Sequence, residues 1–185
     1  PVPSMMFQHI IIPEIYDIIE EVPAGTKNAY ESDGKYYAFK DGYLIDGALC
    51  EGPCPPSKNG GQFDAVLEQG DVVAMFFGHD HKNDFEGEVD GVLLAQVKGT
   101  GFNGYSDGIR TGVKLITIDE ESIPSFETKD YYFTDFGLQS KSAILPHQAM
   151  TEEQKKTVKK IGAGVAAVTA ATAIGAVIKK IFKKK

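Results

Sequence analysis

The sequence predicts a mixed α/β fold in which helix and strand alternate early and a run of strands follows. The segment from Val72 to Gly78 is apolar without polar alternation, which is typical of a strand buried on both faces of a sheet. Segments rich in β-branched and aromatic residues come after it, separated by Gly and Asp turns. A chain of 185 residues is long enough to form one domain with a real core.

The first third of the chain is expected to hold one strand, one helix and a long loop region. Residues 4–12 read as a short buried strand that ends near His9. Pro13 suits the first position of a helix, and apolar residues recur at helical spacing after it. These apolar residues are Ile15, Ile18, Ile19 and Val22. Residues 23–58 are rich in Gly, Pro, Asp and Tyr, which predicts loops of a length that often carries function.

A second short helix precedes the buried strand, and further strands follow it. Residues 61–70 place Phe63, Val66 and Leu67 on one helix face, and Gly70 is a suitable stop. Beyond Gly78, strands are predicted in "GVLLAQVKG", "TGVKLITID" and "KDYYFTDF". The Gly-rich "GTGFNGYSDG" lacks the strand–turn–helix context of a nucleotide-binding loop, so we expect a loop at the rim of a pocket.

Charge is divided unevenly along the chain. The net charge is −7, yet nine Lys and two Glu give the segment from Thr151 onward +7, so the first 150 residues carry −14. An acidic body repels phosphate backbones, so nucleic acid is not an expected partner. Cys50 and Cys54 are too few for a disulfide scaffold. Their spacing allows one local disulfide or two free thiols, and no structural zinc site is expected.

The C-terminal segment differs in character from the rest. Thr151 and Gln154 suit a helix capping box, and residues 161–178 contain no charge between flanking lysines. As a helix this run would span about 27 Å, close to the ~30 Å hydrocarbon core of a bilayer. We therefore predict a C-terminal apolar helix that anchors the chain in a lipid bilayer. The alternatives are a soluble Ala-rich helix, a low-complexity tail, or a basic end that binds anionic lipid.

Three of the four histidines are expected at the ends of strands. His9 ends the first strand, whereas His79 and His81 follow Gly78 at the end of the buried strand. Ligands gather at the carboxyl ends of parallel strands, and residues two apart in extended chain point to one face. Two imidazoles can then converge on one pocket, and imidazole suits Zn, Fe, Mn and Ni. A lone histidine is usually structural or exposed, and we interpret His147 as a surface residue.

These residues carry a resemblance to a known family. "GHDHKNDFEGEVDGV" resembles the GHxH block of calcineurin-like metallophosphoesterases, of the group related to purple acid phosphatases. "FQHIIIPEIYD" resembles that group's HxPxPE segment. "CEGPCPPSKNGGQFDAVLEQGDVVAMFFGHDH" resembles its cysteine-bearing loop, short helix and strand, and "TGFNGYSDGIRTGVKLITID" resembles its Gly-rich return and closing strand. The blocks follow the family's order and cover about residues 5–120.

The resemblance implies a binuclear metal site that hydrolyses phosphoric esters. Two metal ions, of Fe, Mn or Zn, would bind the phosphate and lower the pKa of a bound water that attacks phosphorus. By motif, His9 and His79 would ligate one metal and His81 the other. The groups that would orient the imidazoles are Asp80, Asn83 and Asp84. Ordinary turn chemistry is the alternative role for these three polar residues.

The sequence also departs from the family's pattern. The family's N-terminal half has D-x-H, G-D and G-N-H motifs, which supply the bridging aspartate, an Asn ligand and a His that contacts phosphate. No D-x-H stands on a leading strand here, and Asp71 precedes a strand instead of following one. We therefore expect residues 1–125 to be the C-terminal half of a four-layer α/β/β/α sandwich. A closing strand and connector over 126–150 and the apolar helix within 151–185 would complete the chain.

Two functions follow as expectations. The first is a metal-dependent hydrolase of phosphomonoesters or phosphodiesters, present here as a half that is inactive alone. The second is a non-catalytic, membrane-anchored module that keeps the fold without the metals. The chain enters a strand-like run without an initiator Met, which indicates a piece of a longer protein. Lysines flank both ends of the apolar run, so charge favours neither topology, and we expect the body outside the cytoplasm.

Overall fold

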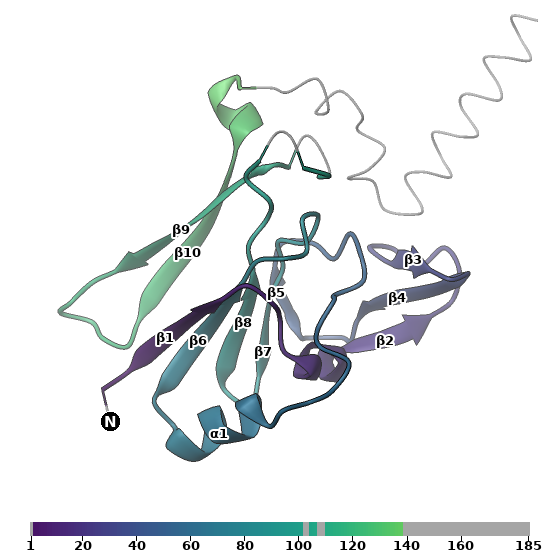
Figure 1. The fold of residues 1–185 in the computed structure, drawn as a ribbon. Helices are drawn as coiled ribbons and strands as arrows, with labels where there is room; N and C mark the ends of the chain where they lie inside the picture. The colour runs from purple at the N-terminus through teal and green to yellow at the C-terminus, as the bar shows by residue number, and fades with distance from the viewer. Residues whose placement is uncertain (1, 102–103, 107–109, 139–185) are drawn as a thin grey trace, which may run out of the picture.

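A five-stranded sheet forms the centre of the computed structural model, which describes residues 2–101, 104–106 and 110–138 (Figure 1). The predicted C-terminal helix and His147 lie outside the described residues. The strands of the sheet are β1 (Ser4–Gln8), β6 (Val72–Phe77), β8 (Val92–Gln96), β7 (Glu86–Val89) and β5 (Leu44–Asp46), in that spatial order. β1, β6 and β8 are mutually parallel, whereas β7 and β5 add antiparallel pairs. The prediction of a mixed α/β fold is confirmed.

One face of the central sheet packs against the helices and a small second sheet (Figure 1). These elements are α1 (Gln62–Gln69), the 3-10 helix η1 (Pro13–Ile18), and the strands β2 (Ile19–Val22), β3 (Tyr30–Ser32) and β4 (Lys35–Phe39). Met75 and Phe77 alternate with Phe76 along β6, so they point to this face and are buried against it. They pack in one cluster with Ile15, Ile18 and Phe63.

A hairpin covers part of the opposite face. It consists of β9 (Gly112–Ile118) and β10 (Phe126–Tyr132), which pair antiparallel. Phe76 from the central sheet packs here against Ile116 and Phe126 of the hairpin. The hairpin leaves the face over β1 open, because the ring of Phe7 is 67% exposed even though it stacks on Phe76. In the described part of the chain, helices, central sheet and hairpin therefore form successive layers (Figure 1).

Several predicted elements are confirmed and others need correction. The helix over α1, with Gly70 as its cap, and the buried strand β6 match their predictions. The helix predicted from Pro13 is a 3-10 helix that ends at Ile18, because the β-branched residues after it pair with β4 instead. The first strand is not buried: β1 is an edge strand of the described sheet.

The predicted loop region 23–58 contains three short strands, β3, β4 and β5. Two tyrosines and a phenylalanine in "KYYAF" favour β4, which pairs with β2 on one side and β3 on the other. β7 was not predicted, because "EGEV" has no apolar alternation and depends on pairing with β8. Among the residues that the structure describes, no helix is long and apolar enough to cross a membrane.

Candidate metal centre

The three parallel strands end together at one edge of the sheet. Gln8, Phe77 and Gln96 are register partners across β1, β6 and β8. The residues that follow these strands therefore meet at their carboxyl ends, where α/β sheets bind ligands. His9 follows β1, and the segment with His79 follows β6. The structure places all three predicted histidines, His9, His79 and His81, around one pocket of about 260 Å³.

His9 and His79 are in direct contact. The Nε2 atom of His9 lies 3.2 Å from the Nδ1 atom of His79, and the rings meet edge to face with centroids 5.0 Å apart. His79 has a φ of 73°, which is uncommon for a residue with a side chain. Two imidazole nitrogens this close can share one proton or direct two lone pairs at one cation. Both nitrogens are of the type that first-row transition metals bind, so the pair could hold an ion together.

His81 is held by backbone and ring contacts with Tyr105. Its Nδ1 atom lies 2.8 Å from the Tyr105 carbonyl oxygen, and the two rings stack with centroids 4.2 Å apart. A carbonyl only accepts, so Nδ1 carries the proton and the lone pair of Nε2 is available to a ligand. Gly99 and Gly104 lie close to the His81 side chain. A Cβ added at Gly99 would lie 3.2 Å from the Cβ of His81. The Gly-rich loop thus lines the pocket, as predicted.

Asp80 and Asn83 hold a neighbouring loop against the segment that carries the histidines. The Oδ1 atom of Asn83 accepts from the backbone N–H groups of Cys50 (2.8 Å) and Glu51 (3.0 Å). Its Nδ2 atom donates to the Glu51 carbonyl at 3.0 Å and to Asp80 Oδ2 at 3.3 Å. Asp80 also accepts from the N–H of Cys54, and burial raises the pKa of Asp80 to about 6. These two side chains therefore fix the backbone between the histidines.

Asp84 is the centre of a buried charged cluster. Both of its oxygens accept from Arg110, and Oδ2 accepts from the Tyr132 hydroxyl at 2.8 Å and faces Lys98 Nζ at 3.5 Å. Oδ1 also accepts from the N–H of Ala48. Burial lowers the pKa of Arg110, but the Asp84 carboxylate outweighs that effect and the pKa is raised. Asp84 thus ties the histidine segment to the start of the hairpin.

Sequence reasoning did not single out Gln96, Tyr105 or Arg110 as parts of this region. Gln96 is fully buried at the end of β8, and its amide donates to the carbonyl oxygens of Gly78 and Asp80. One amide in the otherwise apolar "VLLAQV" was an available signal. The roles of Tyr105 and Arg110 depend on contacts 24 and 26 positions away, for which no local pattern exists.

The donor set of the pocket is made of imidazoles. Within the described residues, no group of three or more His, Cys, Asp or Glu side chains is arranged to hold a metal ion. Cys50 and Cys54 are not joined by a disulfide. Two converging nitrogens and a third imidazole beside them fit a first-row transition metal as part of its ligand set. A complete site for two ions would need further ligands, carboxylates above all.

Two curated proteins of Arabidopsis thaliana are similar to this chain. "Probable inactive purple acid phosphatase 14" is 37% identical over 71 residues, which are 38% of this chain and 18% of that protein. "Probable inactive purple acid phosphatase 29" is 33% identical over 86 residues, 46% of this chain and 22% of that protein. Over less than half of its length, the chain is thus similar to purple acid phosphatase-like proteins. It spans about a fifth of the length of these two relatives. No family model and no solved structure matches it.

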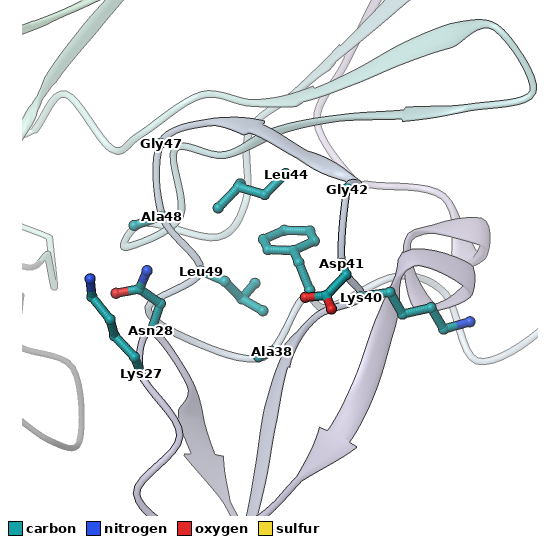
Figure 2. Close-up of a pocket in the computed structure, with 11 residues that line it drawn as sticks. Lys27, Asn28, Ala38, Lys40, Asp41, Gly42, Leu44, Gly47, Ala48 and Leu49 are labelled. Carbon is teal, nitrogen blue, oxygen red and sulfur yellow. The ribbon is translucent and has the colours of Figure 1, made fainter.

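A second pocket lies away from the histidines (Figure 2). It has a volume of about 270 Å³ and shares no lining residue with the histidine pocket. Leu44 and Leu49 line its interior, and Lys27 stands at its rim. Gly47 closes one side with a φ of 80°, and a Cβ there would collide with the Asp84 carbonyl. One wall of this pocket is therefore the loop around Gly47, which packs on the segment that carries Asp84.

Proposed function

We propose that this chain is the C-terminal part of a metal-dependent phosphoric ester hydrolase in which His9, His79 and His81 are metal ligands. The observation that carries the proposal is the 3.2 Å approach of His9 Nε2 to His79 Nδ1 at the ends of parallel strands. The similarity to purple acid phosphatase-like proteins supports this family, although the names of both relatives call them inactive. The substrate is a phosphomonoester or a phosphodiester.

The three histidines and the residues around His81 each have a defined role in this proposal. His9 and His79 would hold one ion, and His81 would hold a second. When bound, ions such as Fe, Mn or Zn polarise the phosphate and activate a water molecule. The Tyr105 carbonyl keeps the proton on His81 Nδ1, so the opposite nitrogen stays a ligand. The glycines at 99 and 104 let the loop approach this ring without a side-chain collision.

We further propose that the remaining strands of a four-layer sandwich, and the carboxylate ligands, come from a part of the protein outside this chain. An apolar groove of about 470 Å³ lies between β1 and the hairpin. Phe7 and Ile118 line it and are 67% and 55% exposed. Apolar surface of this kind is typical of an interface. The open face over β1 supports a partner layer at this position.

A non-catalytic module is the second candidate function. Both relatives carry the words "probable inactive" in their names. The described residues also lack a group of three or more potential ligands placed to hold an ion. In this version the fold is retained, the metals are absent, and the protein acts as a membrane-anchored binding module.

The bilayer anchor over residues 161–178 and a body outside the cytoplasm are also proposals. The uncharged run between lysines supports the anchor and leaves the side of the body open. A membrane fraction that carries the full chain should retain it after alkaline carbonate extraction. A chain ending at residue 150 should be released, and equal release of both chains would contradict the anchor.

Metal content and hydrolysis of p-nitrophenyl phosphate and its bis ester test the main proposal. The full reading frame should bind about two metal ions and turn over, whereas residues 1–185 should bind metal weakly and be inactive. The double variant His79→Ala and His81→Ala should lose both properties in the full reading frame. His147→Ala is the matched control and should keep them. A folded, metal-free and inert full protein would favour the non-catalytic module.

A further inference from the structure

One buried amide supports the turn that presents His79. Gln96 ends β8 with no exposed surface, and its Nε2 atom donates to the Gly78 carbonyl and, at 3.4 Å, to the Asp80 carbonyl. These two carbonyls flank His79 in the chain. We propose that Gln96 is a positioning residue of the metal centre, which fixes the backbone at His79 and so brings its ring onto His9. The inference rests on the proposed function only for its consequence, metal affinity.

The backbone at His79 requires such a support. Its φ of 73° lies in the left-handed region, where a side chain is strained unless the surroundings impose the conformation. The turn has one internal hydrogen bond, from the Asp80 N–H to the Gly78 carbonyl at 2.9 Å. Gln96 adds a second donor to the Gly78 carbonyl and reaches the carbonyl on the other side of His79. Gln96 thereby holds, from β8, the peptide unit before His79 and the one that follows Asp80.

The acceptor oxygen of the Gln96 amide makes no such hydrogen bond. The Oε1 atom of Gln96 is buried and has no hydrogen-bond partner among the described residues. A buried unsatisfied oxygen destabilises a fold, whereas an apolar side chain of similar volume would avoid that cost. The preceding residues of the strand, Leu94 and Ala95, are apolar and fully buried. The buried oxygen is thus a cost that an apolar side chain would not carry, and the two hydrogen bonds donated to the turn offset it.

The first test measures the conformation of His79 by NMR on the full, metal-free chain. Gln96→Met keeps the volume and removes both donors, so His79 should lose the chemical shifts of a left-handed residue and its ring contact with His9. Leu94→Met is the control, because it lies two residues earlier on the same face of β8 and conserves volume. A folded Gln96→Met protein with unchanged His79 signals would overturn the proposal. In the unaltered chain, the Nε2 protons of Gln96 should exchange slowly compared with those of exposed Gln69; equal exchange would also overturn it.

The second test titrates Co²⁺ into the same proteins. Loss of a group that orients a ligand typically weakens metal binding 10- to 100-fold, and we expect a loss of this size for Gln96→Met alone. Leu94→Met should bind like the unaltered chain. An unaltered chain that binds no Co²⁺ contradicts the proposed function of the histidines, and the NMR comparison then still decides the role of Gln96. Equal affinity of Gln96→Met and the unaltered chain would refute the positioning role.

Discussion

His9 Nε2 lies 3.2 Å from His79 Nδ1, although the two residues are 70 positions apart in the chain. The contact exists because β1 and β6 are neighbours in a parallel sheet and end in register. Helices, small strands and a loop separate the two strands in sequence. The contact between His9 and His79 therefore forms only when the sheet assembles. Substitutions in loops that contact the histidines should in turn alter metal binding.

Gly99→Ala should displace His81. A Cβ at this position would lie 3.2 Å from the Cβ of His81, so the ring must shift or the loop must move away. Overpacking of this kind costs about 1–3 kcal/mol, and the displaced ligand should weaken Co²⁺ binding by about tenfold. Isothermal titration with the full chain measures the affinity. Gly101→Ala is the matched control, because nothing lies within 4 Å of its added Cβ. Equal affinities of the two variants would contradict the prediction.

Asn83→Asp should destabilise the fold although it changes a single atom. The Nδ2 atom of Asn83 donates to the Glu51 carbonyl and to Asp80 Oδ2, so an aspartate would place an acceptor against two acceptors in a fully buried position. Losing a buried hydrogen bond and burying an unpaired charge together lower the free energy of unfolding by about 3 kcal/mol or more. Urea denaturation of the full chain measures it.

Asn59→Asp provides the control for this substitution. Asn59 also donates to a carboxylate, Glu14 at 2.6 Å, but it is exposed, and solvent screens the new repulsion. The two variants therefore differ mainly in burial. A similar loss of stability in both would show that burial of Asn83 is not the reason for the effect.

Strong local patterns allowed part of this structure to be predicted. Gly70 after an amphipathic turn marks α1, and the unbroken apolar run marks β6. The strand ends then locate the histidines, because parallel strands finish at one edge. The helix predicted through Ile19 and Val22 was wrong, because these β-branched residues pair with β4 as a strand.

The contacts around the site could not be predicted from local patterns. Asp84 looks like a turn residue in the sequence, yet in the fold it accepts hydrogen bonds from Arg110 and Tyr132. The left-handed conformation of His79 has no local sequence signal, since Gly78 precedes it and would be the expected site of unusual φ. Such features arise from tertiary contacts that form only when the strands assemble.

Asp84→Ala should be among the most destabilising single substitutions in the described part of the chain. It removes a fully buried carboxylate that faces Arg110, Lys98 and the Tyr132 hydroxyl. Breaking a buried ion pair typically costs about 3–5 kcal/mol. Urea denaturation followed by circular dichroism measures this loss. Glu21→Ala is the comparison, because its ion pair with Lys35 joins side chains that are 54% and 58% exposed, and it should change little. An Asp84→Ala protein as stable as Glu21→Ala would contradict the structural role of the cluster.

Lys114 should make the fold sensitive to alkaline pH. Its Nζ atom is buried between Glu86 at 2.7 Å and Asp130 at 2.9 Å. Burial lowers the pKa of Lys114, but the hydrogen bonds to the two carboxylates outweigh it and raise the pKa above 10.5. A raised folded-state pKa means that protonated Lys114 stabilises the fold below pH 10.5, and that this contribution is lost as pH rises through the folded-state pKa. Lys114→Met should therefore cost about 3 kcal/mol at pH 7.

The pH profile separates this charge effect from a loss of packing. The free energy of unfolding of Lys114→Met, measured in urea from pH 7 to 12, should fall less steeply above pH 10.5 than that of the unaltered chain. Lys129→Met is the matched control, because it makes the same substitution at an exposed position of β10. A general effect of replacing lysine by methionine should appear in this variant too, whereas the loss of a buried charge should not. Parallel profiles for Lys114→Met and the unaltered chain would mean that the pKa of Lys114 is the same in the folded and unfolded states. That result would contradict the prediction.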